Sequence, residues 1–205
     1  SRAYAKAVYG DHPYGDETDE ASLNKIDTGM MKAFHARHFV PCRAKVSIVG
    51  AINREQATQR VEQLLKGLPA SQNCDLLPIV PEVQPLANAQ NIAIPFESAQ
   101  AHVFIGQPGI ARQNPDFFAL TVGNYVLGGG GFVSRLTDQV REKRGLSYSV
   151  YSYFSPGQHA GAFTVGLQTR PDQAAQAIEV ATGVVTEFVQ KGPTEAEVKA
   201  AKDFL

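Results

Sequence analysis

Apolar residues recur every three or four positions in several stretches of the chain, the spacing that places them on one face of an α-helix. The pattern predicts helices over residues 1–9, 28–39, 114–127 and 133–143, and further helices that begin near residues 53, 171 and 194. Start signals support three of them: Asn53 with Gln56, Pro115 at a first helical position, and a capping box of Thr194 with Glu197. The helix after Pro171 has an apolar stripe formed by Ala174, Ile178, Ala181, Val185 and Phe188.

Shorter apolar or alternating runs predict β-strands over residues 44–50, 91–96, 101–107, 146–155 and 161–169. Residues 91–96 should pair with 101–107, and a turn that contains Pro156 and Gly157 should join the last two strands. From residue 90 onward, pairs of strands alternate with pairs of helices. This order predicts an α+β fold, in which helices pack on one face of a largely antiparallel sheet.

A proline-rich stretch divides the chain into two parts. Residues 67–89 have few periodic apolar positions and contain Pro69, Pro78, Pro81 and Pro85. We therefore predict one domain over residues 1–68, a linker over 69–89 and a second domain over 90–205. The chain has no initiator methionine and its final residues, TEAEVKAAKDFL, stop within a helical pattern, so we expect a fragment of a longer protein.

The composition is that of a globular protein. Of the 205 residues, 43% are hydrophobic and 19% are charged, with a net charge of −1. This balance argues against nucleic acid or an anionic membrane surface as the main partner, and no apolar run reaches the ~20 residues that span a bilayer. Cys42 and Cys74 match no metal-binding spacing, and we expect both to be plain thiols.

Four consecutive glycines open the segment with the strongest chemical signal, LGGGGFVSRLTDQVREKRGLSYSVYSYF at residues 127–154. A left-handed helix cap needs only one glycine, so Gly128, Gly129, Gly130 and Gly131 suggest either a structural turn or close approach of a peptide ligand. A phosphate loop is disfavoured, because the lysine and Ser/Thr of GxxxxGK[ST] are missing and no strand precedes the glycines.

Arg141 lies seven residues before Tyr148, across a helix-to-strand junction at Gly145. One interpretation is structural: Arg141 belongs to a solvated helix face, and Tyr148 alternates with Leu146 and Val150 as a half-buried strand residue. The other is functional, because a guanidinium and a phenol can together bind a substrate carbonyl and stabilise its developing oxyanion.

Other catalytic motifs have little support. His35 and His38 are three residues apart on a predicted helix, but neither HEXXH nor HXXEH occurs in the chain, so we interpret them as surface residues. The remaining histidines, His12, His102 and His159, are isolated in the sequence. No GxSxG elbow is present to support a serine hydrolase.

The segment 127–154 resembles the second-domain signature of the pitrilysin/insulinase family of zinc metallopeptidases, the inverzincins, which includes bacterial proteases similar to the mitochondrial processing peptidase. HPYG at residues 12–15 resembles a turn that follows the family's metal-binding helices. FHARHFVPCRAKVSIVGAINREQ resembles the helix–strand–helix that closes the first domain. QNIAIPF, QAHVFIGQPG, YVLGGG and GAFTVGLQTRPD fit the second domain, so the resemblance spans nearly the whole chain.

The resemblance implies two related α+β units, with the end of one and most of the next in this chain. It implies that Arg141 and Tyr148 assist catalysis and that Gly128–Gly131 contact the substrate. Zn²⁺ is implied in the full-length or assembled enzyme, bound by an HXXEH helix upstream or on a partner subunit. No zinc ligand carries over to this chain, which alone is expected to be inactive.

The implied partners are a peptide or unfolded polypeptide, held extended along a sheet edge, and a related peptidase subunit in a homodimer or heterodimer. Likeness to bacterial relatives suggests the periplasm, with the cytoplasm as the alternative. Two functions follow: part of a zinc metalloendopeptidase, or a non-catalytic structural or peptide-binding homologue. The presence of Arg141 and Tyr148 favours the first, and the missing HXXEH motif motivates the second.

Overall fold

The computed structural model of the chain describes residues 2–69, 74 and 78–205, and these residues form two compact units. One unit comprises residues 1–17 and 80–205, and the other comprises residues 18–79. The predicted domain boundary, with its linker over residues 69–89, concerns the full-length protein and stays a prediction; part of that linker lies outside the described residues. Within the described ranges, no helix is both long and apolar enough to cross a bilayer.

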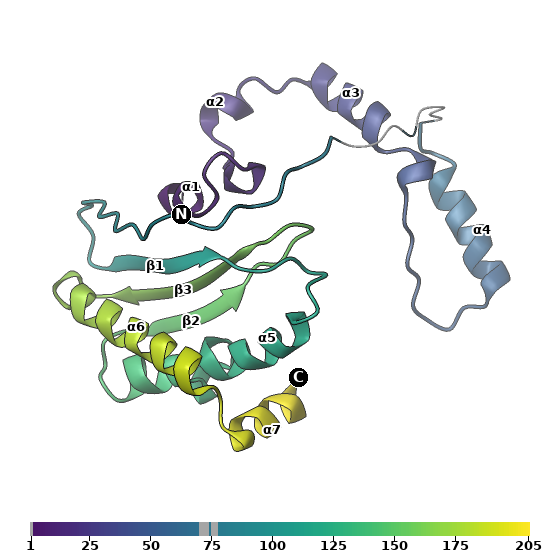
Figure 1. The fold of residues 1–205 in the computed structure, drawn as a ribbon. Coiled ribbons are helices and arrows are strands. Elements are labelled where there is room, and N and C mark those ends of the chain that lie inside the picture. Colours follow the sequence, from purple (N-terminus) through teal and green to yellow (C-terminus); the bar gives the residue numbers. More distant parts are fainter. Residues whose placement is uncertain (1, 70–73, 75–77) are drawn as a thin grey trace. The chain divides into compact units, whose positions relative to one another are not determined.

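The larger unit is built on a three-stranded antiparallel sheet in the order β1-β3-β2 (Figure 1). The strands are β1 (Ala101–Pro108), β2 (Ser149–Phe154) and β3 (Ala162–Thr169). The central strand β3 pairs with both neighbours, so that Phe104, Gly166 and Tyr151 lie side by side in register. The predicted α+β class, with helices on one face of an antiparallel sheet, is confirmed.

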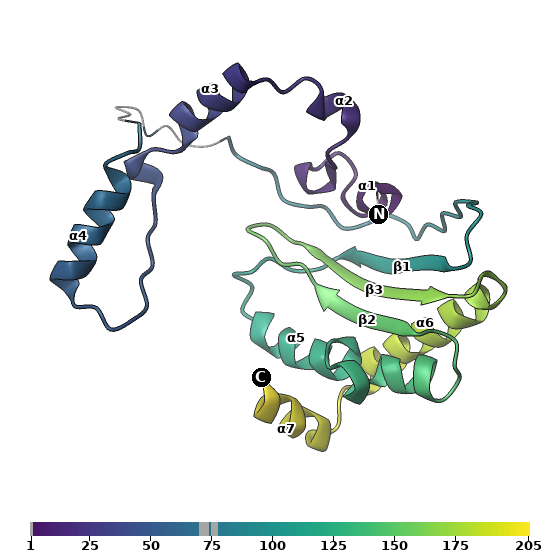
Figure 2. The same cartoon turned by 180° about the vertical axis from the view of Figure 1, so that it is seen from behind.

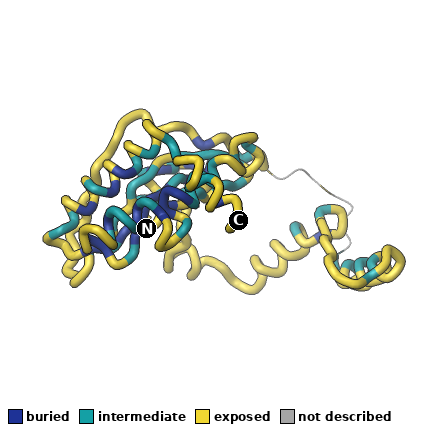
Figure 3. The backbone as a smooth tube through the Cα atoms, turned by 90° about the horizontal axis from the view of Figure 1, so that it is seen from below, coloured by how far each residue is buried: buried dark blue, intermediate teal, exposed yellow. Residues whose placement is uncertain are grey.

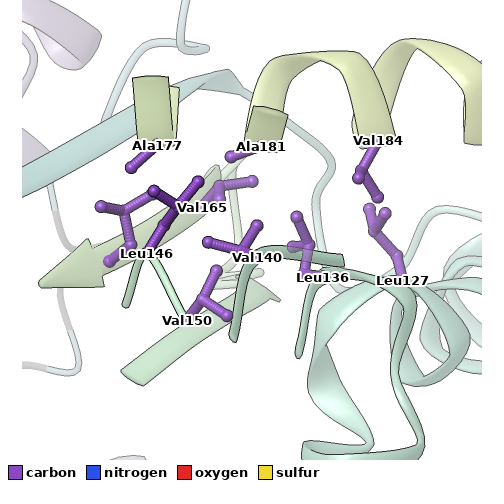
Figure 4. Close-up of a cluster of buried hydrophobic side chains, with 10 residues drawn as sticks. Leu127, Leu136, Val140, Leu146, Val150, Val165, Ala177, Ala181 and Val184 are labelled. Carbon is purple, nitrogen blue, oxygen red and sulfur yellow. The ribbon is translucent and has the colours of Figure 1, made fainter. Parts of the chain in front are cut away.

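Helices cover one face of this sheet, as the views from the two sides show (Figures 1 and 2). Along the chain they are α5 (Phe117–Asn124), the π-helical turn η3 (Tyr125–Gly129), the 3₁₀ turn η4 (Gly131–Val133), the π-helical η5 (Thr137–Glu142), α6 (Ala174–Lys191) and α7 (Glu195–Phe204). The core lies between sheet and helices, where Ala177, Ala181 and Val184 of α6 pack with buried residues of the strands and η5 (Figure 4).

The N-terminal segment binds the opposite face and one end of the sheet. It contains α1 (Arg2–Tyr9) and the 3₁₀ turn η1 (Pro13–Gly15). The Tyr4 hydroxyl lies 2.7 Å from Thr164 Oγ1, and the Tyr9 hydroxyl accepts a hydrogen bond from the Ala162 backbone N–H at 2.8 Å. Burial raises the pKa of both phenols. The hydroxyls of Tyr4 and Tyr9 therefore attach the N-terminal segment to β3.

The unit over residues 18–79 is helical and largely exposed (Figure 3). It contains α2 (Glu20–Leu23), α3 (Thr28–His38), the 3₁₀ turn η2 (Pro41–Arg43) and α4 (Arg54–Leu65). Among its described residues, only Val40 is buried. A disulfide joins Cys42 to Cys74 with a Cα–Cα distance of 6.3 Å, so the prediction of two plain thiols is wrong. Spacing along the chain does not reveal which loops approach each other.

Two predicted strands are not formed. Residues 44–50 and 91–96 have no regular secondary structure, and their apolar side chains, among them Ile48 and Ile94, are exposed. A strand requires a neighbour to accept and donate its backbone hydrogen bonds, and β1 pairs with β3 instead of with residues 91–96. The stripe predicted on α6 is also partly wrong, because Ala177 and Val184 are buried where Ile178 is exposed.

Candidate functional site

The turn at Gly145 brings Arg141 and Tyr148 together. The helix η5, which carries Arg141, ends at Glu142, and Gly145 follows with a φ of 61°, the left-handed conformation that favours glycine. The Gly145 N–H donates to the Arg141 carbonyl at 2.8 Å, and the Leu146 N–H donates to the Val140 carbonyl at 3.0 Å. The chain then reverses, and the Arg141 guanidinium carbon lies over the Tyr148 ring, 4.7 Å from its centroid.

Tyr148 is an exposed residue immediately before β2. Leu146 and Val150 are buried in the core, but 80% of Tyr148 is exposed. The buried Ser147 hydroxyl lies 2.6 Å from the Gln168 carbonyl oxygen and 2.7 Å from that of Ser149, which fixes the backbone beside Tyr148. The structural interpretation of Tyr148 as a half-buried strand residue is therefore wrong, and its hydroxyl is open to a ligand.

The Arg141 guanidinium is held by aromatic rings more than by acids. A second ring, that of Phe132 in η4, also lies 4.7 Å from the guanidinium carbon. The closest carboxylate contact recorded for Arg141 is Glu142 Oε1 at 3.4 Å from Nε. By contrast, the Arg144 guanidinium donates two hydrogen bonds to Gln139. Cation–π contact positions a guanidinium without engaging its in-plane N–H donors, so the terminal N–H groups of Arg141 stay available to a ligand while its Nε faces Glu142.

Arg135, two residues before η5, has a different role. It donates two hydrogen bonds of 2.7 Å to the Glu197 carboxylate of α7 and one of 3.2 Å to the Gly192 carbonyl. The Arg135 guanidinium, together with hydrogen bonds from Thr194, lowers the pKa of Glu197 to about 2. The same bonding raises the pKa of Arg135. This ion pair fixes the helix of Arg141 against α7.

Two hydrogen bonds between Asn124 and Ser152 connect the segment before the four glycines to strand β2. The Asn124 amide donates to the Ser152 carbonyl at 3.0 Å, and the Ser152 hydroxyl donates to Asn124 Oδ1 at 2.8 Å. Gly128 is buried against this pair, and a Cβ on it would lie 2.5 Å from the Ser152 nitrogen. Gly129 and Gly131 are exposed, and Gly131 has a φ of 58°. A role of the four glycines in substrate binding stays a prediction. Of the four, Gly129 and Gly131 are the ones accessible to a substrate.

The side chains that the structure describes offer no zinc site. Within residues 2–69, 74 and 78–205, no group of three or more His, Cys, Asp or Glu side chains is arranged to hold a metal ion. The buried His12 is engaged by its own neighbours, since its Nδ1 accepts from the Tyr14 N–H and its Nε2 lies 2.8 Å from the Pro81 carbonyl oxygen. We derive no chemical step through a metal from these residues.

Comparisons with known proteins identify the family to which this chain belongs. The family model described as the Peptidase M16 inactive domain matches residues 25–205. The chain therefore belongs to the M16 peptidase family, and the resemblance to the pitrilysin/insulinase peptidases is confirmed. The crystal structure of a peptidase M16 inactive domain from Pseudomonas fluorescens superposes with a TM-score of 0.88 at 35% identity, covering 98% of this chain and 48% of that one.

Two curated relatives differ in how they are described. An uncharacterized zinc protease of Streptomyces coelicolor is 29% identical over 203 residues, covering 97% of this chain and 44% of the relative. A non-peptidase homolog of Helicobacter pylori is 31% identical over 188 residues, covering 90% of this chain and 42% of the relative. The chain thus spans less than half the length of both.

Phe132 and Asn124 are the site residues that sequence reasoning missed. The only available signal for Phe132 was its place directly after the glycines, because an exposed aromatic residue has no periodic pattern. For Asn124 the signal was its amide side chain within an otherwise apolar helix. A buried amide needs a hydrogen-bond partner.

Proposed function

We propose that this chain forms the substrate-binding part of an M16 zinc metallopeptidase and contributes Arg141 and Tyr148 to transition-state stabilisation. The observation that carries the proposal is the Arg141 guanidinium, which lies over the exposed Tyr148 ring. Exposed Gly129 and Gly131 offer backbone to an extended peptide, because they have no side chain to exclude it.

The chemistry assigned to the pair is electrostatic. When water attacks a peptide carbonyl, negative charge develops on its oxygen, and donors placed there in advance lower the barrier. Arg141 supplies a permanent positive charge with N–H donors, and Tyr148 supplies an O–H donor. Arg141 lies on the helix η5, and Tyr148 lies one residue before β2 beside the hydrogen-bonded Ser147, so both donors are held more firmly than on a free loop.

Zinc and the bond-breaking step are assigned elsewhere. Zinc would be bound in the full-length protein upstream of this chain, or on a related peptidase subunit in a homodimer or heterodimer, and would there activate the attacking water. The substrate would be a peptide or unfolded polypeptide. We assign the protein to the periplasm; the Cys42–Cys74 disulfide supports this location, because disulfides persist in oxidising compartments.

The test is Arg141→Ala in the full-length protein with its natural partner. Loss of one oxyanion donor should lower kcat for an unfolded polypeptide on the order of 100-fold. Arg144→Ala is the matched control, because Arg144 lies on the same helix end but bonds only to Gln139 in the described structure. Equal turnover in the two variants would contradict the assignment.

A non-catalytic peptide-binding role is the second candidate. The inactive-domain description of the family model and the non-peptidase relative favour it. It predicts that the wild-type full-length protein, supplied with zinc and its partner, hydrolyses no polypeptide but still binds peptide. Measured turnover that Arg141→Ala removes would exclude this role.

A further inference from the structure

Phe132 occupies an unusual position beside the candidate site. It lies in the turn η4, one residue after the last of the four glycines, and 71% of it is exposed. Its ring contributes nothing to the buried core. The recorded aromatic contact of this ring is with the Arg141 guanidinium, whose central carbon is 4.7 Å from the Phe132 centroid and equally far from that of Tyr148.

We infer that Phe132 is a positioning residue, which holds the Arg141 guanidinium in place beside Tyr148 so that its N–H donors stay directed at the substrate carbonyl. The inference rests on the proposed function of Arg141. A long arginine side chain has many rotamers, and ordering it in advance removes an entropic cost from the reaction. Two rings restrict the guanidinium to fewer of these rotamers than one ring does.

The turn that carries Phe132 is itself fixed. The buried Ser134 hydroxyl donates to the Gly131 carbonyl at 2.7 Å, and the Ser134 N–H donates to the same oxygen at 3.1 Å. The Gly131 φ of 58° sets the direction of the chain into Phe132. The glycine run is attached to β2 through Asn124 and Ser152. Phe132 is thus presented to Arg141 from a rigid turn, as a positioning role requires.

A carboxylate that bonded both edges of the guanidinium would hold Arg141 more strongly but would occupy the donors that the substrate needs; the Glu142 carboxylate approaches Arg141 at Nε, 3.4 Å away. The Arg135–Glu197 pair shows the effect, since that guanidinium donates two hydrogen bonds to one carboxylate. An aromatic ring contacts the face of the guanidinium and leaves its edge open. The contact with Phe132 therefore suits Arg141, whose guanidinium must be held in position and must still donate hydrogen bonds to the substrate.

The test compares three variants of the full-length protein with its partner. Phe132→Leu removes the ring and keeps an apolar side chain, Phe132→Tyr keeps the ring face, and Val133→Ala is the matched control at the neighbouring exposed position. Since Phe132 is exposed, none of these changes disturbs the core.

The first readout is the NMR signal of the Arg141 Nε–H, identified by its loss in Arg141→Lys. Protons over an aromatic face are shielded, so Phe132→Leu should move this signal toward the position of a free arginine, and the other two variants should leave it in place.

The second readout is turnover of an unfolded polypeptide. Phe132→Leu should lower kcat about tenfold with KM changed less than about twofold. A misplaced Arg141 donor weakens the stabilisation of the transition state more than the binding of the substrate. Phe132→Tyr should restore kcat, and Val133→Ala should match the wild type. An unmoved Arg141 signal in Phe132→Leu would overturn the inference, whatever the turnover.

A moved signal with unchanged turnover would also overturn it, provided that Arg141→Ala is inactive. That result would leave the proposed function intact. If Arg141→Ala is as active as the wild type, the proposed function fails and the positioning role fails with it. The NMR result then reports only whether the three side chains contact one another.

Discussion

Each of the four consecutive glycines meets its own steric requirement. A Cβ on Gly128 would lie 2.5 Å from the Ser152 nitrogen, one on Gly129 would lie 2.7 Å from Asn124 Nδ2, and one on Gly130 would lie 2.7 Å from the Tyr125 carbonyl oxygen. Gly131 has open space around it but a left-handed φ. Three glycines thus permit close approach of the chain to itself, and the fourth turns it toward Phe132.

Substitution of two glycines by alanine should change stability in opposite directions. Gly128→Ala should destabilise the sheet unit by about 1–3 kcal/mol, because the added methyl group overlaps buried backbone that cannot move away. Gly183→Ala, in the middle of α6 with no atom near the new methyl group, should stabilise the unit by about 0.5–1 kcal/mol. Hydrogen exchange of the β3 amides measures both changes in the full-length protein. Stabilisation by Gly128→Ala would show that the glycine is not required for packing.

At the level of single residues, the sequence predicted the pair Arg141 and Tyr148 because Gly145 marks the turn between them. It did not predict that Tyr148 would be exposed, since its position alternates with buried Leu146 and Val150. The strand begins only at Ser149, one residue too late to bury Tyr148. The roles of Phe132 and Asn124 depend on contacts with distant residues, which have no signature in the local sequence.

Helices were easier to predict than strands because their stabilising signals are local. The helix start predicted at Asn53 and the capping box predicted at Thr194 are both formed, and Asn53 makes a capping box as well. Pro115 does not begin α5, because the Asn114 side chain accepts from the Asp116 N–H and delays the helix to Phe117. Strand formation depends on non-local contacts, because a strand needs backbone hydrogen bonds from a neighbouring strand that can be distant in the sequence. The local pattern of residues 44–50 and 91–96 therefore predicted strands that do not form.

The capping box at Thr194 has a second function that gives α7 a pH dependence. The pKa of Glu197 is lowered from 4.5 to about 2, so its contribution to stability is present above the ordinary carboxyl value and is lost as the pH falls toward 2. Glu197→Gln keeps a capping residue but removes the charge opposite Arg135, and should destabilise the unit at pH 7 by about 1 kcal/mol. Melting of wild type and variant at pH 7 and at pH 3 should show that this difference shrinks in acid.

The control for that measurement is Asp203→Asn, which removes the exposed pair of Asp203 with Lys199. An exposed pair of this kind contributes little, so the variant should melt like the wild type at both pH values. A Glu197→Gln difference that stays constant between pH 7 and pH 3 would rule out the charge as its cause.

At the scale of the whole molecule, the two units differ in how much apolar surface they bury. The sheet unit contains a contiguous core (Figure 4). In residues 18–79 the apolar side chains of α3 and of the segment after η2 are exposed, among them Met30, Met31, Phe34, Val46 and Ile48. On α3 alone, Met30, Met31 and Phe34 are exposed, and several exposed apolar side chains on one helix are typical of an interaction surface. The relatives are more than twice as long as this chain. We therefore expect the remaining part of a full-length protein to cover these exposed apolar side chains.

Oxidation of the two methionines tests whether the full-length protein covers this surface. Met30 and Met31 are 53% and 61% exposed on α3 and are the only methionines of the chain. If the rest of the protein covers α3, peroxide should oxidise both about tenfold more slowly in the native protein than in denaturant, because oxidation follows exposure. Val189→Met places a reference methionine on α6, at a site that is 78% exposed. Mass spectrometry of the peptides measures all three rates in one sample. Native oxidation of Met30 and Met31 as fast as that of the reference would mean that this face of α3 remains open in the complete protein, and its cover would then have to be sought in a partner subunit.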